Sequence, residues 1–149
     1  AAFVGPEIGF RHPTPQDLQR AKDILARRKP DDQKPTLEDI YAERITRMAD
    51  YPERAPIALQ ALRIGDLAIG TIPCEVFVET GLELKRRSPF KPTFIVSLAH
   101  GYFGYLPTPE HHRLGGYETW LGTNRLIPGA EPQIVDTLLG LFARLHESP

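Results

Sequence analysis

The chain has 149 residues, 41% of them hydrophobic and 25% charged, with a formal net charge of −1. This length and apolar content suit one soluble domain, or part of one, that can bury a core. The balanced charge, without a basic patch, argues against nucleic-acid binding and against attraction to an anionic membrane surface. The single cysteine, Cys74, excludes an internal disulfide and a Cys-rich zinc finger. No apolar run in the sequence approaches the ~18–20 residues of a transmembrane segment.

Residues 1–56 are predicted to be a helical segment. Residues 1–13 are expected to be irregular, because Gly-Pro and His-Pro pairs interrupt them. Helices are predicted over Thr14–Arg28 and Thr36–Asp50, since each stretch begins with a threonine that can cap it and has an acidic residue in its first turn. A polar connection, residues 29–35, joins them.

Residues 57–149 are predicted to be an α/β segment. The expected elements, in order, are strands over 57–64 and 67–72 joined by a Gly65-Asp66 turn, a helix over 75–87, a buried strand over 93–98, a loop over 99–108, a short helix over 109–114, an irregular stretch over 115–128 and a helix over 131–145. This alternation indicates an α/β fold, with a mixed sheet flanked by helices.

Three side chains in this second segment are candidates for chemistry. Glu75 is predicted at the junction of a strand and a helix, where the helix dipole favours the ionised carboxylate. Tyr105 follows an aromatic run, and Tyr117 follows two glycines. Each has an ordinary structural explanation, since acids often only cap helices and aromatic residues often only line a core or groove. A tyrosine metal ligand also requires the ion to lower a pKa that is normally ~10.

The histidines and serines offer weaker candidates. His111 and His112 are adjacent, so in a helix their rings point to different faces and do not form a ligand pair. His100, in the glycine- and tyrosine-rich loop, is the more plausible site histidine, in a hydrogen-bonding role. No serine has the Gly-x-Ser-x-Gly context of a nucleophile elbow, so the sequence predicts no serine nucleophile.

Three motifs, in order and at matching spacings, resemble those of the neutral (alkaline, non-lysosomal) ceramidases. Pro73-Cys74-Glu75, with a glycine six residues beyond the glutamate, resembles the Pro-Gly-Glu motif of that family. Tyr105-Leu106-Pro107-Thr108 stands where the family has a Tyr-Val-Thr-Thr-type motif. Tyr117-Glu118 follows at the distance of the family's Tyr-Glu pair. The resemblance covers roughly residues 57–146 and is strongest over Pro73–Glu118.

The resemblance implies a zinc-dependent amide hydrolase that cleaves an N-acyl linkage, in a sphingolipid, another N-acyl lipid or a small amide. It implies that Glu75 and Tyr105 are ligands of Zn²⁺ and that Tyr117 stabilises the oxyanion. The two histidine ligands are expected from outside this chain, from a missing amino-terminal part of the same protein or from another chain. We therefore expect residues 1–149 to be an incomplete, carboxyl-terminal part of a larger catalytic domain, inactive alone because two protein ligands are too few. The family also suggests a secreted or periplasmic location.

Two alternatives stay open. The first is that the chain is a non-catalytic structural or partner-binding α/β module of the same lineage. The second is that it is part of a zinc hydrolase of a smaller amide or ester. Cys74 in place of the motif glycine, and Leu82-Glu83 in place of a basic pair, favour the non-catalytic module. The joint presence of Glu75, Tyr105 and Tyr117 opposes it.

Overall fold

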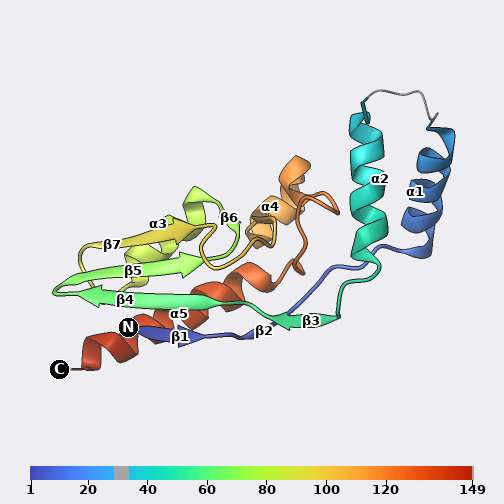
Figure 1. Ribbon diagram of the computed structural model, residues 1–149. Coiled ribbons are helices and arrows are strands. Elements are labelled where there is room, and N and C mark those ends of the chain that lie inside the picture. Colours follow the sequence, from blue (N-terminus) through green and yellow to red (C-terminus); the bar gives the residue numbers. More distant parts are fainter. Residues whose placement is uncertain (29–33, 149) are drawn as a thin grey trace.

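A four-stranded mixed sheet lies at the centre of the computed structural model, which describes residues 1–28 and 34–148 (Figure 1). The strand order is β1-β4-β5-β7. Pairing is antiparallel from β1 to β5 and parallel between β5 and β7. The four strands are β1 (Ala2–Val4), β4 (Leu59–Ile64), β5 (Leu67–Ile72) and β7 (Thr93–Ser97).

One face of this sheet is covered by α3 (Val78–Arg87) and α5 (Ala130–Glu147), as Figure 1 shows. Gly70 in β5 allows the close approach of α5, because a Cβ there would lie 3.0 Å from the ring of Phe142. The apolar residues that α5 buries follow a helical spacing, which is why the sequence predicts this helix. They are Ile134, Val135, Leu138, Leu141, Phe142 and Leu145. The predicted α/β fold, with a mixed sheet flanked by helices, is confirmed.

The opposite face of the sheet carries an apolar row beside a row that includes the polar Gln60 and Thr71. Cross-strand register places Leu62, Ile69 and Phe94 in one row across it, because side chains on neighbouring strands that lie opposite each other share a face. The sequence predicts a buried strand over 93–98; the strand is confirmed, but its predicted burial is wrong. β7 is an edge strand, and Phe94 and Val96 are 41% and 39% exposed.

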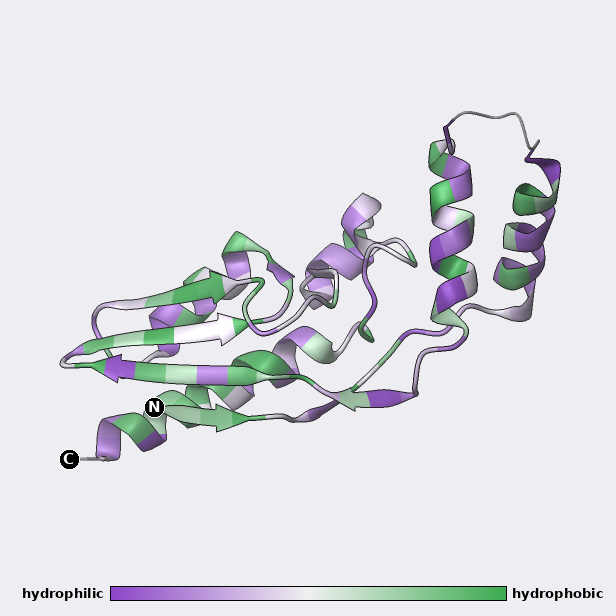
Figure 2. Ribbon diagram, viewed as in Figure 1, coloured by the Kyte–Doolittle hydropathy of each residue, from purple (hydrophilic) through white to green (hydrophobic). Residues whose placement is uncertain are grey.

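The helices α1 (Pro15–Arg27) and α2 (Leu37–Met48) form a hairpin that stands away from the sheet (Figure 1). Both are as predicted, and both begin with a capping box in which Thr14 or Thr36 exchanges hydrogen bonds with the acid three residues on. Figure 2 shows hydrophobic and hydrophilic stretches alternating along each of the two helices, which is the pattern of an amphipathic helix. Most of the predicted connection 29–35 lies outside the described residues.

The expectation that residues 1–13 are irregular is wrong. They contain β1 and β2 (Glu7–Gly9), and β2 pairs with β3 (Arg54–Pro56). Three-residue strands are too short to show a period of two, and their partners lie more than 40 residues away. The division at residue 56 stays a prediction, although β1 in the first segment pairs with β4 in the second.

The remaining elements are short and carry the candidate residues. They are β6 (Glu75–Val76), β8 (Tyr105–Leu106), α4 (Pro109–Leu114) and the 3₁₀ helix η1 (Tyr117–Thr119). The helix predicted over 75–87 begins three residues later, so Glu75 lies in a strand instead of at a helix N-terminus. Among the helices described, none has the length and hydropathy that crossing a bilayer requires.

A buried acid joins α3 to α5 and makes stability depend on pH. The hydroxyl of Thr80 donates to Oε1 of Glu131 over 2.7 Å, and burial raises the pKa of Glu131. The folded state therefore holds that proton more tightly than the unfolded state, so this contribution to stability is present at low pH and lost as pH rises above the unfolded pKa, normally about 4.5.

We predict that Glu131→Gln is more stable than the parent chain at pH 7 by ~1 kcal/mol, because the neutral amide avoids the cost of a buried charge. The difference should close toward pH 4, where the parent carboxyl is protonated. Urea unfolding at both pH values measures it, with the exposed Glu53→Gln as control. An equal effect of Glu131→Gln at both pH values contradicts the prediction.

Candidate functional site

The candidate site forms where β6 and β8 pair in parallel. The register places Glu75 directly opposite Tyr105. The backbone N–H of Glu75 donates to the carbonyl of Gly104 over 2.9 Å, and that of Phe103 donates to the carbonyl of Pro73 over 2.9 Å. Two stretches that are about thirty residues apart in the sequence therefore lie side by side, with one carboxylate and one phenol on neighbouring strands.

Four side chains gather at this point of the surface. The hydroxyl oxygens of Tyr105 and Tyr117 are 2.6 Å apart and share a hydrogen bond, with the two rings edge to face. The hydroxyl of Tyr102 donates to Oε1 of Glu75 over 2.9 Å. Glu75 and Tyr105 are half-buried, and Tyr117 is 46% exposed. The cluster thus combines a carboxylate with three phenols, and it is open to solvent.

A close backbone contact fixes the loop that carries Tyr105. Gly104 has φ +79, and a Cβ at this position would lie only 2.2 Å from the carbonyl oxygen of Thr123. The N–H of Tyr105 donates to that same carbonyl over 3.1 Å. Only glycine allows both the backbone conformation and the approach. The segment that follows Tyr117 is thereby held against the start of β8.

Asn124 adds a buried hydrogen-bonded link behind the cluster. This side chain is 1% exposed; its Nδ2 donates to the carbonyl of Tyr105 over 3.0 Å. Its Oδ1 accepts from Nη1 of Arg11 over 2.8 Å. Sequence reasoning missed both Asn124 and Tyr102 as site residues. Tyr102 belongs to the aromatic run before Tyr105, but nothing in the local sequence marks Asn124.

The electrostatics of the cluster keep two of its phenols protonated. The hydrogen bond with Tyr117 is the main cause that raises the pKa of Tyr105, and the neighbouring Glu75 carboxylate adds to the shift. Burial, followed by the hydrogen bond to Glu75, raises the pKa of Tyr102. A cation close to Tyr105 would act in the opposite direction, because positive charge favours the phenolate.

The nearby histidines have other partners. The ring of His111 stacks on Phe77 with centroids 4.1 Å apart. Its Nδ1 lies 2.8 Å from Oγ1 of Thr108, the residue that caps α4. The sequence favours His100 as a site histidine, but its Nε2 lies 3.1 Å from Oε1 of Gln60 in β4 and shares a hydrogen bond with it. Within residues 1–28 and 34–148, no group of three His, Cys, Asp or Glu side chains is placed to hold a metal ion.

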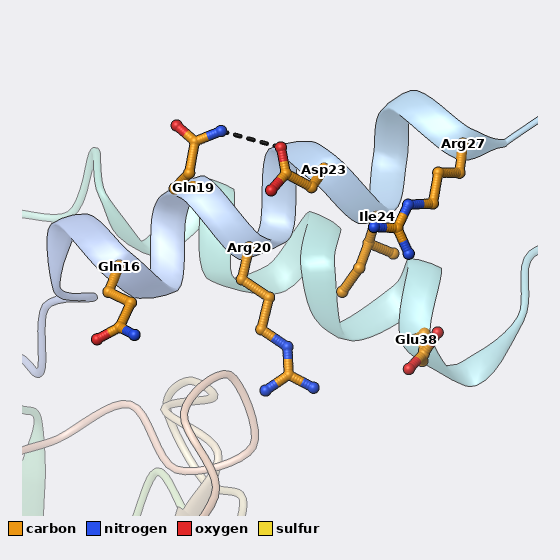
Figure 3. Close-up of a pocket in the computed structure, with 7 residues that line it drawn as sticks. All are labelled: Gln16, Gln19, Arg20, Asp23, Ile24, Arg27 and Glu38. Atoms are coloured by element: carbon orange, nitrogen blue, oxygen red, sulfur yellow. Dashed lines mark hydrogen bonds between the residues drawn. The ribbon is translucent and has the colours of Figure 1, made fainter.

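A hollow of about 330 Å³ along α1 is a different kind of surface (Figure 3). Its polar side chains point in different directions, and the one hydrogen bond drawn between them joins Gln19 to Asp23 over 2.9 Å. Such side chains form the solvated face of a helix, so this hollow is not the candidate site.

Comparison with known proteins shows the fold. No protein-family model matches the chain, and no curated protein matches it by sequence. Among solved structures, the chain is similar to the neutral ceramidase from Pseudomonas aeruginosa, with a TM-score of 0.54 and 22% sequence identity. The match covers 64% of this chain and 16% of that one, so the chain corresponds to a small part of the ceramidase. The fold is therefore ceramidase-like, as the motifs of the β6–β8 region imply.

We predict that Gly104→Ala destabilises the chain by ~3 kcal/mol or more, because the new Cβ meets a backbone carbonyl and the residue keeps a left-handed conformation. Gly65→Ala is the matched control, since Gly65 has φ +59 but a Cβ there would have nothing within 4 Å. The control should lose only ~1–2 kcal/mol. Denaturant unfolding compares the two; equal losses would mean that the contact with Thr123 contributes nothing.

Proposed function

We propose that this chain provides the carboxylate and tyrosine part of a zinc-dependent amide hydrolase that resembles neutral ceramidase and cleaves an N-acyl linkage. One observation carries the proposal. Glu75, Tyr105 and Tyr117 come from three separate segments and gather at one solvent-accessible point. The ceramidase-like fold supports the same lineage.

The donor set fits half of a zinc site. A carboxylate oxygen is an ordinary zinc ligand, and a phenol oxygen becomes one when the ion lowers its pKa. Glu75 and Tyr105 lie opposite each other on paired strands, so their side chains are neighbours, which supports a shared role as ligands. Two ligands are too few for a stable site, so the remaining ligands come from outside residues 1–149. Their source is an amino-terminal part of the same protein or another chain.

The residues of this chain have distinct tasks in such an enzyme. Glu75 and Tyr105 would hold the zinc, which when bound polarises the carbonyl of the scissile amide. The phenol of Tyr117 is exposed and already positioned as a hydrogen-bonding group next to Tyr105. It donates to the amide oxygen as negative charge develops there. Tyr102 orients the Glu75 carboxylate by donating to Oε1.

A non-catalytic α/β module of the same lineage is the second candidate. The hydrogen bonds of Tyr105 with Tyr117 and of Tyr102 with Glu75 favour it, since a purely structural polar cluster would also satisfy its own groups. Zinc content of the complete protein separates this candidate from the first. Hydrolysis of a smaller amide or ester would use the same residues and would differ only in substrate.

We predict that Glu75→Ala in the complete protein lowers bound zinc well below one equivalent, because a ligand is lost. Glu110→Ala is the control; Glu110 is an exposed acid whose partner is Arg113. Zinc is measured by elemental analysis after dialysis. Full zinc occupancy in Glu75→Ala would remove Glu75 as a ligand.

Tyr117→Phe should leave zinc content unchanged and lower kcat for an N-acyl substrate by ~10²–10³, the usual cost of losing one oxyanion donor. The matched control is Tyr51→Phe, because the ring of Tyr51 packs edge to face on Phe10.

The isolated 149-residue chain should have no appreciable amidase activity. Wild-type kcat in Tyr117→Phe, or robust turnover by the isolated chain, contradicts this mechanism.

A further inference from the structure

The side chain of Arg11 connects the amino-terminal stretch to the candidate site. One of its nitrogens, Nη1, donates to the carbonyl oxygen of Thr119 over 2.6 Å and to Oδ1 of Asn124 over 2.8 Å. Thr119 ends η1, which begins at Tyr117, and Asn124 donates to the carbonyl of Tyr105 over 3.0 Å. One guanidinium group is therefore linked to both of the segments that carry the paired phenols.

The backbone beside Arg11 is fixed independently of this side chain. The N–H of Arg11 donates to the carbonyl of Arg125 over 2.8 Å, and the N–H of Ile127 donates to the carbonyl of Gly9 over 3.0 Å. Between these two bonds, the ring of Phe10 is buried in the hydrophobic core. Replacing the guanidinium group leaves these attachments in place, so variants at this position are expected to fold.

The acceptors of Arg11 differ from those of an arginine in a surface ion pair. The exposed Arg113 donates to the carboxylate of Glu110, whereas both oxygens that Nη1 of Arg11 reaches are neutral. Burial is the largest influence on the pKa of Arg11 and lowers it, so the group is partly withdrawn from water and needs protein acceptors. Its two hydrogen bonds therefore fix the relative position of two segments of the site.

The phenol of Tyr117 needs such support. It is 46% exposed, yet its oxygen lies 2.6 Å from that of Tyr105. The helix η1 that carries it has only three residues, and 3₁₀ hydrogen bonds have poor geometry. We propose that Arg11 is a positioning residue that holds η1 against β8 and so places the Tyr117 hydroxyl beside that of Tyr105. This role rests on the proposed function, in which Tyr117 donates to the substrate and Arg11 acts only through it.

A double-mutant cycle on the 149-residue chain tests this geometry without zinc. Arg11→Met keeps an aliphatic stem and removes every donor, and Tyr117→Phe removes one hydroxyl. Tyr117→Phe should raise the unfolding equilibrium constant about threefold in the parent chain, a usual effect of losing one hydrogen bond. It should have almost no effect in the Arg11→Met background, because the phenol is already displaced. Urea unfolding of the four proteins measures the constants.

Arg63→Met is the matched control, since Nη1 of Arg63 also donates to two neutral oxygens, the carbonyls of Leu145 and Ser148 at the end of α5. In that background Tyr117→Phe should keep its full effect on the unfolding constant.

The same cycle in the complete protein is read through kcat. Arg11→Met should lower kcat for an N-acyl substrate about tenfold or more, with zinc content unchanged, because the oxyanion donor is misplaced. In the Tyr117→Phe background it should lower kcat less than about twofold further, since the group that it positions is gone. Arg11→Lys should keep kcat within about threefold of the parent, because one nitrogen suffices for both hydrogen bonds.

The proposal is overturned if Tyr117→Phe has the same effect on the unfolding constant with and without Arg11→Met, including no effect in either. It is also overturned if the two losses of kcat multiply, or if Arg11→Lys is as slow as Arg11→Met, because Arg11 would then act by another route. The unfolding cycle needs neither zinc nor turnover. Its failure leaves the zinc proposal intact, whereas full zinc in Glu75→Ala removes Glu75 as a ligand and leaves the cycle unchanged.

Discussion

The contact between Gly104 and the carbonyl of Thr123 is the constraint on which the candidate site depends. It holds the loop after η1 against β8, and β8 in turn pairs with β6. That approach, together with the Asn124 side chain that donates to the carbonyl of Tyr105, positions Tyr117 for the 2.6 Å hydrogen bond between the two tyrosine hydroxyls. The site is thus positioned by backbone packing between short strands and irregular segments, in a two-stranded sheet separate from the central one.

Much of the fold could be predicted because its signals are local. The threonine caps of α1 and α2, the Gly65-Asp66 turn and the apolar spacing of α5 each lie within a few residues of the element that they define. The missed features depend on distant partners. β1 and β2 exist because β4 and β3 pair with them, and the helix expected at Glu75 begins later because Glu75 pairs with Tyr105.

The same distinction explains how much of the candidate site the sequence could supply. Motif spacing singles out Glu75, Tyr105 and Tyr117, and the structure brings them together. Tyr102 and Asn124 were missed because their roles arise only from tertiary contacts, with a carboxylate 27 residues away and a carbonyl 19 residues away. The likeness to a ceramidase shows the fold alone, and folds host many activities, so the functional argument depends on the side-chain chemistry of the cluster.

The sheet face opposite α3 and α5 also affects which groups can pack against it favourably. Leu62, Ile69 and Phe94 form one apolar row, and the next row continues from Phe3 to the polar Gln60 and Thr71. Arg63 turns to the other side, where it donates to carbonyls at the end of α5. A charged group placed over the apolar row would lose hydration, which costs free energy. The row of Leu62, Ile69 and Phe94 therefore gains free energy when other apolar groups cover it, and charged groups placed over it do not.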